Sequence, residues 1–240
     1  MPASLNFHYS FPQLDILTKY KYPGENHTVQ TDDGYLLTLH RIPYGRMCSA
    51  DKSRGPVLLQ HGLFSSSVDW FITGTEKGLG KSSPTKHINP KKANNIVLIL
   101  IYVAYILADN CYDVWLGNSR GNTYSKTHSW YPTHSDEYWN FSWHEMGKYD
   151  LRTMIDYILR ATGSKDLQFI AHSQGTTQFL VFNILYPEYK DKVKAAHLLA
   201  PIAFLEHCNS PIIKEIWKHI DVVGVSVIRL QCGKNLRKNY

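Results

Sequence analysis

The feature that most constrains this chain is a series of short apolar runs, each closed by a Gly, Asn or Pro residue. The runs are GPVLLQHG, CYDVWLGN, LQFIAHSQG and KAAHLLAPIA. Short continuous apolar runs are typical of strands that are buried on both faces of a parallel sheet. Segments with helical periodicity lie between them. Strands that alternate with helices predict an α/β fold, with a mostly parallel sheet flanked by helices.

The spacing of apolar residues predicts where the flanking helices lie. Apolar residues follow helical spacing from Met146 to Leu159, and Gly163 supplies a stop. A second apolar helix is expected from about Gly175 until Pro187. Near the N-terminus, DDGYLLTLHRIP joins a turn signal to residues that favour strands, so it predicts a hairpin strand from Tyr35 to Arg41.

Composition limits the partners and cofactors that the chain is expected to need. With 240 residues, 43% of them hydrophobic and 19% charged, it suits one globular domain with a substantial core. The net charge is +6, but the basic residues form no stripe interleaved with aromatic residues, so we expect no nucleic-acid partner. No nucleotide motif is present, and the four cysteines have no zinc-binding spacing. We therefore expect no cofactor and no metal, and the pairing of the cysteines stays open.

Signals for the cellular compartment point in different directions. Asn26-His27-Thr28 and Asn140-Phe141-Ser142 are N-glycosylation sequons, so Asn26 and Asn140 are candidate acceptors that favour a secretory route. The N-terminal residues form no signal peptide, so either the protein stays in the cytosol or its true N-terminus is missing here. The 13 apolar residues from Ile96 to Ala108 are too few for a membrane span, and we expect no transmembrane segment.

The segment FIAHSQGTTQFL places Ser173 between a predicted strand, Leu167 to Ala171, and the helix that follows. This strand–turn–helix order is what a nucleophile elbow requires, because the sharp turn exposes the serine at the end of the sheet. The small residues Ala171 and Gly175 let the strand and the helix approach each other, although the motif usually has Gly where Ala171 stands. An ordinary structural turn is the alternative. We predict that Ser173 is a catalytic nucleophile.

A nucleophilic serine needs N–H donors where the oxyanion of its tetrahedral intermediate forms. The main-chain N–H of Gln174, directly after the serine, is the first candidate. The second is expected from the loop after an earlier strand, where QHGLFSSS places the N–H of Leu63 behind His61-Gly62. Ligands of open α/β sheets bind beyond the C-terminal ends of the strands, so these groups are expected to meet there. We assign Leu63 and Gln174 as backbone oxyanion donors.

Longer motifs carry a resemblance to a known family. The segments TDDGYLLTLHRIP, VLLQHGLFSSSVDW, YILADNCYDVWLGNSRGNTYS, WNFSWHEMGKYDL and HSQGTTQF follow one another within residues 15–220. Together they resemble the acid lipases of the lysosomal and gastric type, which have the α/β-hydrolase fold. The resemblance implies hydrolysis of neutral lipid esters, such as triacylglycerols or cholesteryl esters, at a lipid interface through an acyl-serine intermediate on Ser173. It also implies a secreted or lysosomal location.

The catalytic acid and base of this family are expected far downstream of the serine, in the order Ser, Asp, His. The ionisable candidates after Ser173 match neither position; they are Asp191, His197, His207, His219 and Asp221. His172 is expected to pack beside the elbow, and His61 to belong to the oxyanion loop. We therefore expect no triad Asp or His in this chain.

A serine without an adjacent base is a poor nucleophile, so we expect feeble or no ester hydrolysis by the 240-residue chain. A non-catalytic homologue that binds lipid or a partner is the alternative. A serine hydrolase of small soluble esters is a lesser alternative within the same chemistry.

The resemblance also divides the chain. Residues 1–205 correspond to the N-terminal part of the hydrolase domain, and residues 206–240 to the start of a cap region and a tail unlike the family, so the C-terminal strands and most of the cap are expected to be missing. Residues 81–103 are an atypical insertion, because the family continues from EKGLG almost directly into AYILAD. A lipid-binding insertion would explain it. We favour a translated intron, because removing these residues restores the expected continuation.

Overall fold

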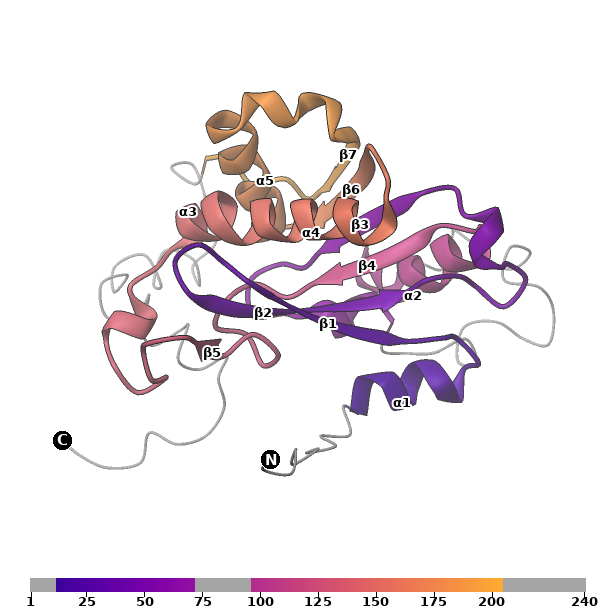
Figure 1. The fold of residues 1–240 in the computed structure, drawn as a ribbon, viewed down its shortest axis with the longest axis horizontal. Helices are drawn as coiled ribbons and strands as arrows, with labels where there is room; N and C mark the ends of the chain where they lie inside the picture. Colours follow the sequence, from indigo (N-terminus) through magenta and orange to yellow (C-terminus); the bar gives the residue numbers. More distant parts are fainter. Residues whose placement is uncertain (1–11, 72–95, 205–240) are drawn as a thin grey trace, which may run out of the picture.

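The computed structural model describes residues 12–71 and 96–204, and a single sheet lies at its centre (Figure 1). The strands are β1 (Glu25–Gln30), β2 (Tyr35–Ile42), β3 (Pro56–Gln60), β4 (Asp113–Gly117), β5 (Thr127–His128), β6 (Leu167–His172) and β7 (Val193–Leu199). Their order is β1-β2-β4-β3-β6-β7, with β5 paired to β2. The run from β4 to β7 is parallel, while β1, β2 and β5 pair antiparallel. This is the predicted α/β architecture, with an antiparallel edge.

Helices cover both faces of the sheet. They are α1 (Pro12–Lys19), α2 (Ile96–Asp109), α3 (Trp143–Glu145), α4 (Arg152–Thr162) and α5 (Gln174–Leu185). One hydrophobic core forms under α3, α4 and α5, where Ile155 and Phe182 pack with Trp115 and Phe169 of the sheet. The other forms against α1 and α2, where Leu17 and Tyr105 pack with strand residues of the opposite face. Figure 1 shows the two layers of helices on either side of the strands.

The sequence predicted one helix from Met146 to Leu159, and the structure divides it. Ser142 and Glu145 form a capping box at the start of α3. A π-helical stretch, η4 (Met146–Leu151), then leads into α4, which ends at Gly163 with φ of 65°. A Cβ atom on Gly147 would lie 2.6 Å from the carbonyl oxygen of Gln178. The absence of a side chain at Gly147 therefore lets this stretch lie directly against α5.

Shorter helical turns complete the described chain. They are η1 (Ala50–Lys52), η2 (Ser67–Trp70), η3 (Glu137–Trp139) and η5 (Pro187–Asp191). The predicted strands near 57–60, 112–116 and 167–171 are confirmed to within one residue. The apolar run from Ile96 is a helix, and none of the described helices is long and apolar enough to cross a membrane. Residues 81–95 of the atypical block and the tail from 206 onward lie outside the described residues.

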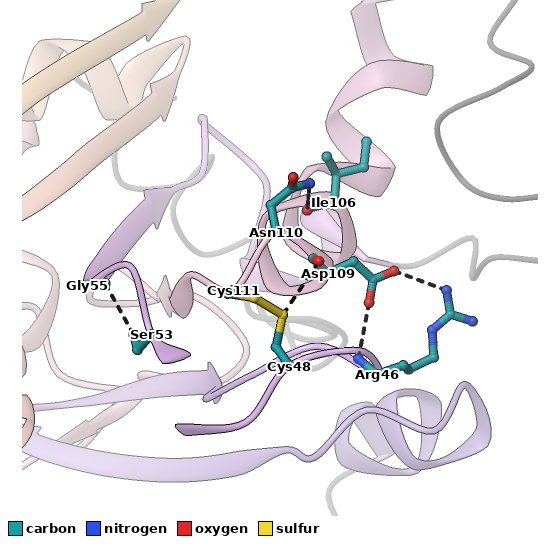
Figure 2. The surroundings of a disulfide bond; sticks show 8 residues. All are labelled: Arg46, Cys48, Ser53, Gly55, Ile106, Asp109, Asn110 and Cys111. Atoms are coloured by element: carbon teal, nitrogen blue, oxygen red, sulfur yellow. Dashed lines mark hydrogen bonds and ion pairs between the residues drawn. A yellow bond between two sulfur atoms is a disulfide. The ribbon is translucent and has the colours of Figure 1, made fainter. Parts of the chain in front are cut away.

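A disulfide joins Cys48, in the loop after β2, to Cys111, just beyond the C-terminal end of α2 (Figure 2). Asp109 reinforces this corner, because its carboxylate accepts hydrogen bonds from the main-chain N–H and the guanidinium of Arg46. The hydroxyl of Tyr22 donates to the same carboxylate. The disulfide settles one pairing that the sequence left open, and it ties the start of β4 to the hairpin edge of the sheet.

Candidate active site

Ser173 lies at the junction of β6 and α5, where the chain reverses direction. Its φ and ψ are 52° and −122°, a left-handed conformation that is rare for a residue with a side chain. The turn is held by main-chain bonds: the Ser173 N–H donates to the Leu199 carbonyl at 3.0 Å, and the Thr176 N–H donates to the Ser173 carbonyl at 2.9 Å. Ser173 is half-buried rather than enclosed in the core. The predicted strand–turn–helix arrangement is therefore present.

Gly175 allows the first turn of α5 to lie against the end of β3. A Cβ atom at this position would lie 2.7 Å from the carbonyl oxygen of His61 and 2.8 Å from that of Gln60. Main-chain atoms cannot move aside as a flexible side chain can, so only Gly fits this approach. Ala171 is fully buried in the core on the other side of the turn, which shows that the extra methyl at the first motif position is accommodated.

The loop after β3 reaches Ser173 at Gly62. A Cβ atom on Gly62 would lie 3.1 Å from the Cβ of Ser173, so the two backbones are nearly in contact. Leu63 follows directly and is 43% exposed. Within the described residues, the main-chain N–H groups of Leu63 and Gln174 have no hydrogen-bond partner. The structure thus brings the Leu63 loop and the Ser173–Gln174 turn together and leaves both N–H groups available.

His61 is buried beneath this loop and takes part in a network that sequence reasoning missed. Its Nε2 atom accepts from the Ser119 N–H at 3.1 Å and lies 3.2 Å from the Asn122 amide nitrogen. Its Nδ1 atom lies 2.7 Å from the Gly62 carbonyl oxygen. Burial lowers the pKa of His61, while the Gly62 carbonyl and Asp69 act in the opposite direction. Only the cluster of polar residues in LGNSRGN hinted at such a network.

The other ionisable candidates lie apart from Ser173 or outside the described residues. His172 precedes the elbow and is half-buried, and its Nδ1 atom would lie 3.3 Å from a Cβ atom on Gly62. Burial lowers the pKa of His172, and Asp69 acts in the opposite direction. His197 is exposed on β7, and Asp191 lies before β7, at the opposite end of the sheet from Ser173. His207, His219 and Asp221 lie outside the described residues. Among the described residues, none supplies a hydrogen bond from a histidine to the Ser173 hydroxyl.

A buried ion cluster supports the loop after β4. The guanidinium of Arg120 pairs with Asp33 at 2.6 Å and with Asp150 at 2.7 Å, and the Arg120 N–H also donates to Asp150. The guanidinium lies 4.0 Å from the centre of the Tyr35 ring. Burial raises the pKa of Asp150, and the Arg120 guanidinium opposes this. The cluster holds in place the loop that carries Ser119 and Asn122.

No group of three or more potential metal ligands is found in residues 12–71 and 96–204. The described residues of the site bring a hydroxyl on a strained turn close to the loop that carries Leu63 and to the first residue of α5, Gln174. Such an arrangement can stabilise the negative charge that develops when a hydroxyl adds to a carbonyl group.

The sheet order, the serine turn and the adjacent loop define a hydrolase of the α/β type. The family profile described as alpha/beta hydrolase fold matches residues 92–220, and the one described as partial alpha/beta-hydrolase lipase region matches residues 14–74. The chain belongs to the α/β-hydrolase family and, within it, to the acid lipases of the lysosomal and gastric type.

Several lipases are similar to this chain. It is 45% identical to Lipase 3 of Drosophila melanogaster over 80% of its own length and 42% of that protein. It is 39% identical to human lysosomal acid lipase/cholesteryl ester hydrolase, covering 83% of this chain and 44% of that protein. It is 38% identical to mouse gastric triacylglycerol lipase, covering 92% and 49%. The chain therefore spans a little less than half the length of these relatives.

Proposed function

We propose that this protein hydrolyses neutral lipid esters, triacylglycerols or cholesteryl esters, through an acyl-enzyme formed on Ser173. The Ser173 hydroxyl attacks the ester carbonyl carbon and gives its proton to a general base. The resulting oxyanion accepts hydrogen bonds from Leu63 and Gln174, and the alcohol then leaves with a proton. Water hydrolyses the acyl-serine and releases the fatty acid. The lipase relatives support ester hydrolysis, and their names support the lipid substrates.

One observation carries this proposal: the left-handed Ser173 lies in near contact with Gly62, and the N–H groups of the residues that follow these two, Gln174 and Leu63, have no hydrogen-bond partner among the described residues. A plain structural turn has no need for such strain, which costs on the order of 1–3 kcal/mol and is concentrated at functional sites. We assign neither the catalytic acid nor the base to a residue of this chain.

Labelling with a fluorophosphonate tests the assignment, because the reagent reacts with activated serine hydroxyls. Because no described residue acts as the base for Ser173, we expect slow labelling by the 240-residue chain, confined to a single peptide that contains Ser173, and no label in Ser173→Ala. Hydrolysis of a long-chain ester should depend on the same residue. A protein that binds lipid vesicles or emulsions but never reacts at Ser173 would contradict the enzyme and favour the non-catalytic binder.

We place the protein in the secretory route, in a secreted or lysosomal location. The Cys48–Cys111 disulfide supports an oxidising compartment, and the lysosomal and gastric relatives agree with it. Of the two sequons, the structure favours Asn140, which is exposed in the turn before α3. Both polar side-chain atoms of Asn26 are buried, without a hydrogen-bond partner among the described residues.

A glycan on Asn140 would form when its amide nitrogen bonds to the anomeric carbon of a lipid-diphosphate-linked oligosaccharide and the lipid diphosphate leaves. We expect secreted protein from eukaryotic cells to lose mass on treatment with an N-glycosidase. Asn140→Gln should abolish this shift. Ser142→Thr should keep both the sequon and the helix cap, and therefore the shift. A shift that persists in Asn140→Gln and disappears in Asn26→Gln would contradict the assignment.

A further inference from the structure

The hydrogen bonds around the His61 ring fix which of its nitrogens carries the proton. Nε2 faces two donors, the Ser119 N–H at 3.1 Å and the Asn122 side-chain amide nitrogen at 3.2 Å. The orientation of the Asn122 amide is not ambiguous, because its Oδ1 atom accepts from the N–H groups of Tyr124 and Ser125. A nitrogen that faces two donors can only accept. His61 is therefore neutral, with its proton on Nδ1.

The Nδ1–H group can then donate to the Gly62 carbonyl, 2.7 Å away. This bond turns that carbonyl towards the buried ring. In a planar trans peptide the C=O and the next N–H point in opposite directions. The Leu63 N–H is therefore turned away from the ring, and Gly62, which belongs to the same peptide, lies in near contact with Ser173.

The ring itself is anchored from a distant part of the chain. His61 is 3% exposed, and Ser119, Asn122 and Asn118 are also buried. The Asn118 Oδ1 atom accepts from the Asn122 amide and from the Ser67 N–H, which lies at the other end of the Leu63 loop. The loop after β4 thus holds the Leu63 loop at both of its ends.

From these contacts we infer that His61 is a positioning residue: its Nδ1–H group holds the Gly62–Leu63 peptide so that the Leu63 N–H faces the oxyanion at Ser173. This inference rests on the proposed function and deepens it. His61 does not touch the reacting atoms and does not act as the base. Its contribution is to fix a donor before the charge appears, which removes the cost of reorienting the peptide during the reaction.

Two substitutions separate the two hydrogen bonds of the His61 ring, the one to the Gly62 carbonyl and the one from the Ser119 N–H. His61→Asn places an amide nitrogen near the position of Nδ1, so it can still donate to the Gly62 carbonyl, but it loses the acceptor for Ser119. His61→Gln reaches the position of Nε2, so it can still accept from Ser119, but it has no donor for the Gly62 carbonyl. His61→Leu removes both, and His197→Asn, on the exposed part of β7, is the control.

The measurements are the fluorophosphonate reaction at Ser173, resolved into reagent affinity and limiting rate, and the tautomer of His61 from the nitrogen shifts of its ring. We expect His61→Gln and His61→Leu to lower the limiting rate about a hundredfold, the loss typical of one oxyanion donor, with the reagent affinity unchanged. His61→Asn should retain most of the rate per folded molecule, and His197→Asn all of it. The ring of the unsubstituted protein should show the Nδ1–H tautomer.

The outcomes distinguish this inference from the proposed function. Equal limiting rates in His61→Gln and His61→Asn would overturn it, as would an Nε2–H or doubly protonated ring. If the unsubstituted protein does not react at Ser173, the proposed function fails, and the tautomer alone then decides whether the ring holds the Gly62 carbonyl. If His61→Leu does not fold, the Asn and Gln variants and the tautomer still decide.

Discussion

At the scale of single residues, the turn at Ser173 stores conformational strain. A residue with a Cβ atom at φ of 52° and ψ of −122° is held there by the hydrogen bonds to Leu199 and from Thr176. Gly adopts such a conformation without a steric penalty, whereas Ala suffers nearly the same penalty as Ser. The serine is therefore kept at this position at the expense of stability, as expected where reactivity requires an exposed hydroxyl.

We predict that Ser173→Gly raises the free energy of unfolding by about 1 kcal/mol and abolishes fluorophosphonate labelling. Ser173→Ala should abolish labelling without this gain, because it keeps the strain. Urea denaturation of the three proteins measures the difference. Equal stabilisation by Ala and Gly would show that burial of the hydroxyl, and not the backbone conformation, is the source of the strain.

The residues of the site differed in how far the sequence could reveal them. Ser173 and Gly175 belong to one local motif, and the structure has the turn that this motif predicted. The part played by His61 depends on Ser119 and Asn122, about sixty residues further along the chain. A contact between segments so far apart leaves no trace in local spacing. The assignments of Leu63 and Gln174 as oxyanion donors remain predictions that the labelling experiments test.

At the scale of elements, the Arg120 cluster joins three segments that lie far apart in the sequence. Asp33 lies in the β1–β2 turn, Arg120 in the loop after β4, and Asp150 in η4. The side chains of Arg120 and Asp150 are each 1% exposed. A buried charge that loses its partner keeps the full cost of leaving water, so the cluster is far more sensitive to substitution than an ion pair on the surface.

We predict that Arg120→Met lowers the free energy of unfolding by about 3–5 kcal/mol, because it leaves Asp150 buried without a counter-charge. Arg152→Ala is the matched control: its pair with Asp32 is largely exposed, so its loss should cost less than about 1 kcal/mol. Guanidinium denaturation measures both. Similar losses in the two variants would mean that water reaches Asp150 in the folded protein.

The helices and strands were predictable from the sequence where the apolar residues follow a clear pattern. The strands β3 and β4 are buried at every position, because both of their faces are covered, whereas buried and half-buried positions alternate in β6. β1 has the sequence ENHTVQ and only one well-buried residue, Val29, so alternation could not identify it. The helix from Met146 to Leu159 was predicted as continuous, because a π-helical stretch shifts the pattern by only one residue. Its break depends on the close approach of Gly147 to α5, which is a tertiary contact.

At the scale of the whole molecule, the Cys48–Cys111 disulfide closes a loop across a sequence separation of 63 residues. This loop contains β3, which runs beside β4 and β6 through the middle of the sheet. A cross-link of this span limits the unfolded chain more than the folded one. The disulfide therefore acts on the stability of the central strands, although Cys48 and Cys111 lie in loops outside them (Figure 2).

We predict that replacing both cysteines by serine lowers the free energy of unfolding by about 4 kcal/mol, the value that chain entropy gives for a loop of this length. Thermal melts with and without a reducing agent measure the loss. The reductant should shift the melting temperature of the natural sequence and leave that of the double variant unchanged. An equal shift in both would assign the effect to a cysteine other than this pair.

The helix α2 contains the end of the atypical block, residues 81–103, and the buried residues that follow it. Among residues 102–109 of this helix, the fully buried ones are Ala104, Tyr105 and Ala108, which lie after the boundary of the atypical block at residue 103, as does Cys111. Val103, the last residue of the block, packs against the same core. A message with the block and a message without it both encode Ala104, Tyr105, Ala108 and Cys111, so these contacts are compatible with either version, and the sequence of the transcript decides which one a cell makes.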